Sequence, residues 1–156
     1  MESGEGTHAR NERAASAGDH GQVLLVDDHD LTREVYAKLL RVFGYHVIEA
    51  KSALTALERC RALQPDVVLL DLRLPDLSGW ETARRLRTDP ATSSCALLVF
   101  SASIDSAGDL HAEDDDGLFD GFVRKPVAAA ELARTIERAL DARRRQRENA
   151  ADGAAA

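Results

Sequence analysis

Five short apolar runs alternate with segments of helical periodicity along the middle of this chain. Several of these runs are continuously apolar, which is typical of strands that are buried on both faces of a parallel sheet. The runs are QVLLV at 22–26, HVIEA at 46–50, DVVLL at 66–70, ALLVF at 96–100 and GFVR at 121–124. The alternation therefore predicts an α/β fold in which a doubly wound parallel sheet carries helices on both faces.

The segments between the runs carry helix signals. Apolar residues recur at steps of three and four from Leu31 through Val35 and Leu39 to Val42, and Gly44 follows as a stop. Three more helices are predicted: one capped by Ser52 and ended by Pro65, one that begins at a Ser78–Glu81 capping box and runs to about Arg87, and one from Ala128 to about Arg143. In segment 102–120, glycines and an acidic run leave few apolar residues, so we expect a helix there to be short or irregular.

Composition limits the class of protein. Of the 156 residues, 44% are hydrophobic and 30% are charged, which is enough apolar material for one buried core. No run approaches the ~18 apolar residues of a membrane helix, residues 1–20 contain no apolar run, and two cysteines are too few for a disulfide framework. We therefore expect a cytoplasmic protein with one domain at 21–142, a disordered leader at 1–20 and a disordered tail at 143–156.

The net charge of −7 is concentrated in one segment. Residues 105–120 contain seven acids and neither Lys nor Arg, while acids and bases balance elsewhere. We expect local mobility there and a negative potential that affects partner choice; a solvated loop that only aids solubility is the alternative. A basic cluster at 143–147 is interpreted as a helix end that runs into solvent, because nucleic-acid sites need a broader basic face. Direct nucleic-acid binding is not expected.

Polar residues follow four of the predicted strands. Asp27 and Asp28 follow the first run, Asp71 the third, Ser101 the fourth and Lys125 the fifth. In parallel α/β folds the functional site lies at the carboxyl ends of the strands, so we expect these side chains to converge. Clustered carboxylates need a compensating cation, and oxygen ligands without His or Cys suit Mg²⁺. An aspartate beside a metal and a lysine can act as the nucleophile in phosphoryl transfer.

The segments LVDDHDLTRE, VVLLDLRLPDLSGWE, LLVFSAS and FVRKPV, in this order and spacing, resemble the receiver domain of two-component response regulators. The resemblance covers residues 21–142. It implies a flavodoxin-like five-stranded sheet in the order 2-1-3-4-5, and a signalling role without independent substrate turnover. No helix-turn-helix unit fits after the last predicted helix, so we expect a stand-alone receiver or one excised from a longer protein.

The resemblance implies a phosphoacceptor and a metal site. Asp71 would accept a phosphoryl group from a phosphohistidine on a histidine kinase or phosphotransfer protein. Asp28 and Asp71 would bind Mg²⁺ directly, the Arg73 backbone carbonyl would be a third ligand, and Asp27 would act largely through water. His29 follows the acidic pair and could lie beside the metal.

The resemblance also implies switch residues. Lys125 would pair with the phosphoryl group, with a cis peptide bond to Pro126 that directs it into the site. Ser101 would hydrogen-bond a phosphoryl oxygen and move, and the rotamer of Phe122 would report that movement. The face formed by segment 102–120, the last strand and the last helix would then control a downstream effector protein.

Two other functions and one departure from the family pattern remain. The chain could be a receiver that only binds proteins, or a phosphatase similar to the haloacid-dehalogenase enzymes, although those carry a second acid where this chain has Arg73. The glycine usually found seven residues before the lysine is replaced by Leu118, with Gly117 one place earlier. We therefore expect a shifted turn into the last strand.

Overall fold

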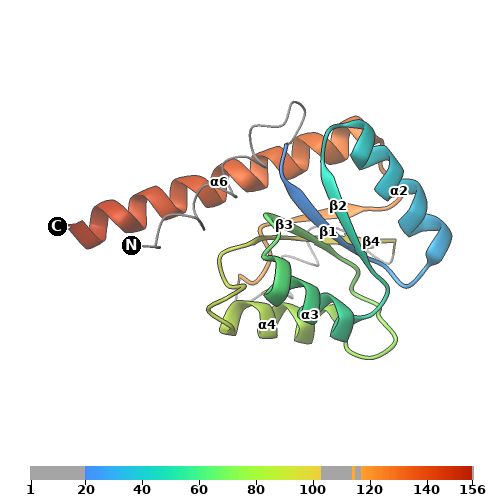
Figure 1. The fold of residues 1–156 in the computed structure, drawn as a ribbon, viewed down its shortest axis with the longest axis horizontal. Helices are drawn as coiled ribbons and strands as arrows, with labels where there is room; N and C mark the ends of the chain where they lie inside the picture. Colours follow the sequence, from blue (N-terminus) through green and yellow to red (C-terminus); the bar gives the residue numbers. More distant parts are fainter. Residues whose placement is uncertain (1–19, 103–113, 115–116, 156) are drawn as a thin grey trace, which may run out of the picture.

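The computed structural model describes residues 20–102, 114 and 117–155. These residues form a flavodoxin-like fold with a five-stranded sheet in the order β2-β1-β3-β4-β5, all of whose pairs are parallel (Figure 1). The strands are β1 (Gln22–Val26), β2 (His46–Ala50), β3 (Val67–Leu70), β4 (Ala96–Ser101) and β5 (Gly121–Arg124). The helices in the described part are α2 (Asp30–Val42), α3 (Ala53–Leu63), α4 (Gly79–Thr88) and α6 (Ala129–Ala155). The predicted fold class and strand order are confirmed.

The sheet separates two apolar cores. Val23 and Leu25 of β1 pack on the side of α2 and α6, whereas Leu24 and Val26 pack on the side of α3 and α4. All four side chains are fully buried, as expected for a central parallel strand. Because every strand runs in the same direction, the residues that follow the strands gather at one edge of the sheet.

The predicted helix caps are largely present. Ser52 accepts a hydrogen bond from Thr55 N at 3.2 Å, and Ser78 accepts one from Glu81 N at 3.1 Å. The chain leaves α2 through Gly44, whose φ of 92° is a left-handed conformation that glycine adopts without a steric penalty.

Helix α2 forms where it was predicted, but three of the four apolar residues that predicted it are exposed, and the fourth, Leu39, is partly buried against the core. Leu31 is 66% exposed and Val42 is 83% exposed, whereas Tyr36, Ala37 and Leu40 are buried against the sheet. The helix is apolar on two sides, and the buried side includes an alanine small enough to let the helix approach the strands. An apolar stripe therefore remains exposed on the outside of α2.

The predicted disordered tail at 143–156 is wrong for most of its length. Helix α6 continues to Ala155, and its C-terminal half extends beyond the sheet (Figure 1). Ala, Arg, Gln and Glu are strong helix formers, so this composition also favours a helix. Arg143 Nε donates to Asp120 Oδ1 at 2.9 Å and Arg147 donates to the Ser94 carbonyl at 2.9 Å. These contacts fasten the extension to the body of the domain.

The loop before β5 is held by a largely buried arginine. Arg87 of α4 donates from Nε to the Leu118 carbonyl at 2.9 Å and from Nη2 to Asp120 Oδ2 at 3.0 Å. Gly117 has a φ of 63°, and the Asp114 carboxylate accepts hydrogen bonds at 2.7 and 3.1 Å from the two backbone N–H groups that follow this glycine. The turn into β5 thus places its left-handed residue one position before Leu118, in agreement with the shifted glycine.

Two other predictions concern the ends and the acidic segment. The predicted leader at 1–20 lies, apart from His20, outside the described residues, as does most of the predicted helix at 102–120.

Among the helices that the structure describes, none combines the length and the hydropathy that crossing a membrane requires.

Candidate functional site

Three carboxylates meet at the carboxyl edge of the sheet. Asp27 and Asp28 follow β1, and Asp71 follows β3, which is the neighbouring strand. Each offers one oxygen atom, and these atoms all lie within 4.8 Å of one another. Asp27 is fully buried and Asp71 is nearly so, while Asp28 is exposed. The convergence predicted from the strand ends is therefore present.

Lys125 lies between two of the carboxylates. Its Nζ is 2.5 Å from Asp27 Oδ2 and 3.4 Å from Asp71 Oδ2, and its side chain is 9% exposed. One ammonium facing three carboxylates leaves a formal charge of −2. This uncompensated negative charge favours the binding of a divalent cation, and a set of ligands made only of oxygen atoms fits Mg²⁺.

The carboxylate of Asp71 is held in one orientation. Ser101 Oγ donates to Asp71 Oδ1 at 3.1 Å, and the backbone N–H of Arg73 donates to the same oxygen at 3.0 Å. The other oxygen faces Lys125. Asp71 thus presents one oxygen fixed by hydrogen bonds and one oxygen directed at a cation.

Asp27 is engaged on both oxygens. Its Oδ2 faces Lys125, and its Oδ1 accepts a hydrogen bond from His29 N at 2.9 Å. His29 caps α2, because its Nδ1 accepts from Thr32 N at 3.2 Å and lies 2.8 Å from Thr32 Oγ1. The Nδ1 atom of His29 is therefore occupied by the helix cap, and this contact gives no support to the prediction that His29 lies beside a metal.

Phe122 lies in an aromatic group near the site. It is half-buried, and its ring centroid is 6.1 Å from that of Phe119, which makes an edge-to-face contact with Trp80 at 5.3 Å. The Lys125–Pro126 peptide bond is cis.

Two residues near the site escaped the sequence analysis. The carboxylate of Asp76 accepts hydrogen bonds from Ala53 N and Leu54 N, each at 2.9 Å, so it ties the loop after β3 to the start of α3. The hydrogen bond from Leu54 holds the pKa of Asp76 below its usual value. A Cβ on Gly79 would lie 2.7 Å from the carbonyl oxygen of Asp71, so only glycine lets α4 begin there. Both residues stand in the motif Pro-Asp-Leu-Ser-Gly, but the backbone groups that donate to Asp76 lie 23 and 22 residues earlier in the sequence.

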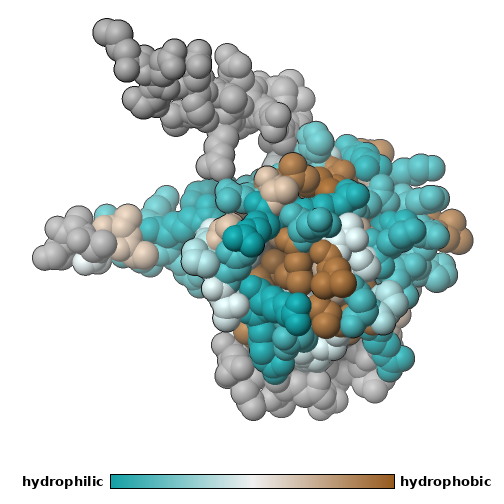
Figure 2. Space-filling model, turned by 60° about the horizontal axis from the view of Figure 1, so that its bottom comes forward, coloured by the Kyte–Doolittle hydropathy of each residue, from teal (hydrophilic) through white to brown (hydrophobic). Residues whose placement is uncertain are grey.

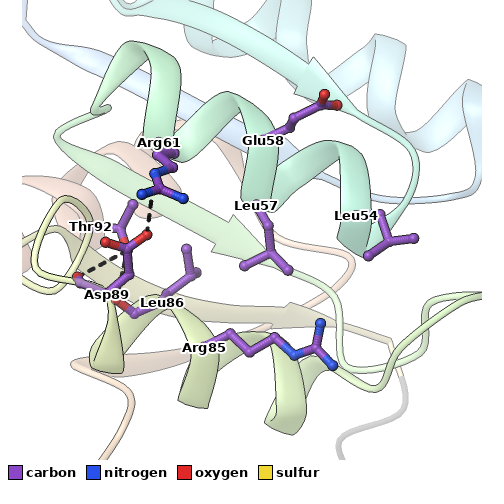
Figure 3. Close-up of a pocket in the computed structure, with 8 residues that line it drawn as sticks. All are labelled: Leu54, Leu57, Glu58, Arg61, Arg85, Leu86, Asp89 and Thr92. Atoms are coloured by element: carbon purple, nitrogen blue, oxygen red, sulfur yellow. Dashed lines mark hydrogen bonds and ion pairs between the residues drawn. The ribbon is translucent and has the colours of Figure 1, made fainter.

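A groove of about 340 Å³ lies elsewhere, between α3 and α4 (Figure 3). Leu54, Leu57 and Leu86 line it, and an ion pair between Arg61 and Asp89 at 3.8 Å closes one end. Figure 2, which brings this side forward, shows apolar surface surrounded by hydrophilic residues. None of the strand-end carboxylates lines the groove, so we place the candidate site at the acidic cluster.

Comparison with known proteins agrees with this geometry. The sequence model of one protein family, the response regulator receiver domain, matches residues 23–137 of this chain. The polar-differentiation response regulator DivK of Brucella ovis is 28% identical over 115 residues, which cover 74% of this chain and 92% of DivK.

Solved structures give the same result. The N-terminal domain of a response regulator receiver protein from Methanoculleus marisnigri JR1 is 32% identical with a TM-score of 0.63, and the match covers 77% of this chain and 96% of that one. The receiver domain of a sensor histidine kinase from Pseudomonas aeruginosa PAO1 has the same fold, with a TM-score of 0.69, 24% identity and coverage of 78% and 98%. That structure has a magnesium ion coordinated in the active-site cleft. With its strand order, its strand-end acids and the match over residues 23–137, the chain belongs to the receiver domain family of response regulators.

Proposed function

We propose that Asp71 accepts a phosphoryl group from the phosphohistidine of a histidine kinase or phosphotransfer protein, in a reaction that requires Mg²⁺. The observation that carries the proposal is the orientation of the Asp71 carboxylate. One oxygen is held by Ser101 Oγ and the Arg73 N–H, while the other faces the Lys125 ammonium at 3.4 Å. The chain acts as a signalling switch and turns over no separate substrate.

The residues of the site have distinct tasks. Asp71 Oδ2 attacks phosphorus as the phosphorus–nitrogen bond to the donor imidazole breaks; the electron pair stays on that nitrogen, which takes up a proton. Lys125 pairs with the incoming phosphoryl oxygens. Ser101 exchanges its hydrogen bond with Asp71 for one with a phosphoryl oxygen.

Asp28, Asp71 and the Arg73 carbonyl would hold Mg²⁺, which when bound neutralises charge on the phosphoryl oxygens. Both oxygens of Asp27 already have partners, which supports a role for Asp27 through water. The fit of the acidic cluster to a divalent cation and the magnesium in the Pseudomonas receiver domain support this assignment.

A movement of Ser101 can be transmitted directly to the neighbouring strand β5. Ser101 ends β4, where it is in register with Arg124 of β5, and Phe122 is two residues earlier on that strand. We assign control of an effector protein to the face that includes β5 and α6, with the Phe122 ring following the movement of Ser101.

Removal of Mg²⁺ tests the proposed reaction. Incubation with a small acyl-phosphate donor and Mg²⁺ should add one phosphate to the intact protein, and EDTA should prevent the addition. Borohydride reduction, which converts an acyl phosphate of Asp to homoserine, should place the modification at Asp71 by peptide mass spectrometry. Labelling that persists in EDTA, or homoserine at another position, would contradict the proposal.

The apolar stripe on α2 is suited to docking of the phosphodonor. Leu31 is 66% exposed and Val35 is 45% exposed, and Leu31 lies three residues after Asp28. We expect Leu31→Ser with Val35→Ser to slow phosphotransfer from a phosphorylated histidine phosphotransfer protein by about tenfold, because the contact area is lost. Labelling by the small donor should be unchanged.

Leu54→Ser with Leu63→Ser is a matched control, since both leucines are exposed on α3, at 57% and 49%. Rapid-quench assays with the purified donor that labels the wild type would measure the rates. Equal slowing by the α2 and α3 variants would exclude α2 as the specific docking surface.

A further inference from the structure

Tyr36 connects α2 to the loop that carries Lys125. Its side chain is buried, at 8% exposure, and its hydroxyl accepts a hydrogen bond from Val127 N at 3.0 Å. Val127 is two residues after Lys125 and 91 residues after Tyr36 in sequence. The hydroxyl therefore fastens the lysine loop to a helix that is remote from it along the chain.

The opposite side of the same loop is fastened to the sheet. Lys125 N donates to the carbonyl oxygen of Ser101, the last residue of β4, at 3.1 Å. The loop thus has one attachment at position 125 and another at position 127. Removal of either attachment would free the lysine backbone to shift relative to the carboxylates.

Tyr36 also supports the lysine side chain through a second aromatic ring. Phe100 is fully buried in β4, and its ring makes an edge-to-face contact with Tyr36, with centroids 4.9 Å apart and planes at 89°. Lys125 Nζ lies 5.0 Å from the centroid of Phe100, within the range of a cation–π interaction. Tyr36 therefore positions both the backbone of the loop and the ring beneath the ammonium.

We propose that Tyr36 is a positioning residue for phosphoryl binding, which holds Lys125 Nζ between Asp27 and Asp71. The proposal rests on the proposed function of Asp71 and adds a residue to it. An apolar side chain would fill this core position, so packing alone does not require the hydroxyl. Its polar partner is the backbone N–H of the lysine loop, which makes the hydroxyl specific to the site.

Lysine position should affect the phosphoryl group more than the metal. Lys125 pairs with carboxylates on the side where the phosphoryl group arrives, whereas Mg²⁺ is held by the acids and a carbonyl. A variant that disturbs only the lysine should therefore leave the affinity for Mg²⁺ nearly unchanged. It should weaken the affinity for beryllofluoride, an analogue of the phosphoryl group, when this is measured with Mg²⁺ present.

Tyr36→Phe is the sharpest variant, because it removes the hydroxyl and keeps the ring against Phe100. Isothermal titration calorimetry should give a Mg²⁺ dissociation constant within about twofold of wild type and a beryllofluoride affinity about fivefold weaker, because the loop that Tyr36 no longer holds must be ordered on binding, at a cost comparable to one hydrogen bond. Labelling by the small acyl-phosphate donor should slow by a similar factor. Hydrogen exchange at the Val127 amide should accelerate.

Tyr45→Phe is the matched control. Tyr45 is also buried, at 4% exposure, and its hydroxyl lies 3.4 Å from the Ala133 carbonyl, away from Lys125. This variant removes a buried tyrosine hydroxyl that lies away from Lys125, so it should leave both affinities unchanged. If both variants weaken beryllofluoride binding equally, or Tyr36→Phe leaves it unchanged, the assignment of Tyr36 is overturned. If the wild type binds no beryllofluoride, the phosphoacceptor proposal itself fails, and the role of Tyr36 fails with it.

Discussion

Asp71→Asn should abolish phosphate incorporation while leaving the fold intact. The amide has the shape of the carboxylate, so Ser101 and the Arg73 N–H keep an acceptor oxygen, but the anionic oxygen that attacks phosphorus is lost. The substitution also removes one of three clustered negative charges, and relief of their repulsion should leave the free energy of unfolding at neutral pH undiminished. Intact-protein mass spectrometry and urea unfolding measure the two effects.

Asp76→Asn is the control for this prediction. It makes the same chemical change five residues further along the same loop, where the carboxylate caps α3. We expect labelling to be retained and stability to fall slightly, because the amide keeps only one of the two acceptor oxygens and loses the negative charge at the start of α3. Incorporation that continues in Asp71→Asn at the wild-type level would remove Asp71 from the role of phosphoacceptor.

The strands could be predicted to within about one residue because each is a buried apolar run that ends at a polar residue. The predicted run at 66–70 begins one residue before β3, since Asp66 is exposed and its side chain accepts from Gln22 N at 2.8 Å. The convergence of the site followed from the same pattern, because topology alone brings strand ends together. Asp27, Asp71 and Lys125 meet for that reason.

Contacts between distant segments were beyond prediction. The exposed side of α2 carries larger apolar side chains than the buried Ala37, so periodicity could not tell which side meets the sheet. The extension of α6 was mistaken for a tail because an Ala- and Arg-rich composition suits a solvated chain and a helix equally. The ion pair that decides between them joins Arg143 to Asp120, 23 residues earlier.

Arg87→Ala should lower the free energy of unfolding by about 3 kcal/mol, near the lower end of what is expected when one partner of a largely buried ion pair is removed. The Arg87 side chain is 14% exposed, and besides Leu118 and Asp120 it donates to the carbonyl oxygens of Ser93 at 2.9 Å and Cys95 at 2.7 Å. Truncation leaves these carbonyls without the guanidinium. Arg87→Lys should recover only part of the loss, because an ammonium cannot reproduce a planar fork of donors.

Arg85→Ala, two residues earlier on α4, is the matched control. Its guanidinium is half-exposed and pairs with Glu81 at 3.2 Å in an i,i+4 arrangement, which is worth at most about 0.5 kcal/mol. Urea unfolding should therefore separate the two variants clearly. A loss below about 1 kcal/mol in Arg87→Ala would show that water replaces the guanidinium at little cost.

Arg87→Ala should also weaken the attachment of α6 to the rest of the domain. Asp120 binds Arg87 through Oδ2 and Arg143 through Oδ1, and it accepts the backbone N–H of Leu97 at 2.8 Å. Without Arg87 the carboxylate is free to turn from Arg143, and the helix loses its attachment where it leaves the sheet. Limited trypsin digestion should then cleave the arginine-rich stretch at 143–147 faster in Arg87→Ala than in Arg85→Ala. Equal cleavage in both would mean that α6 is held by its apolar contacts alone.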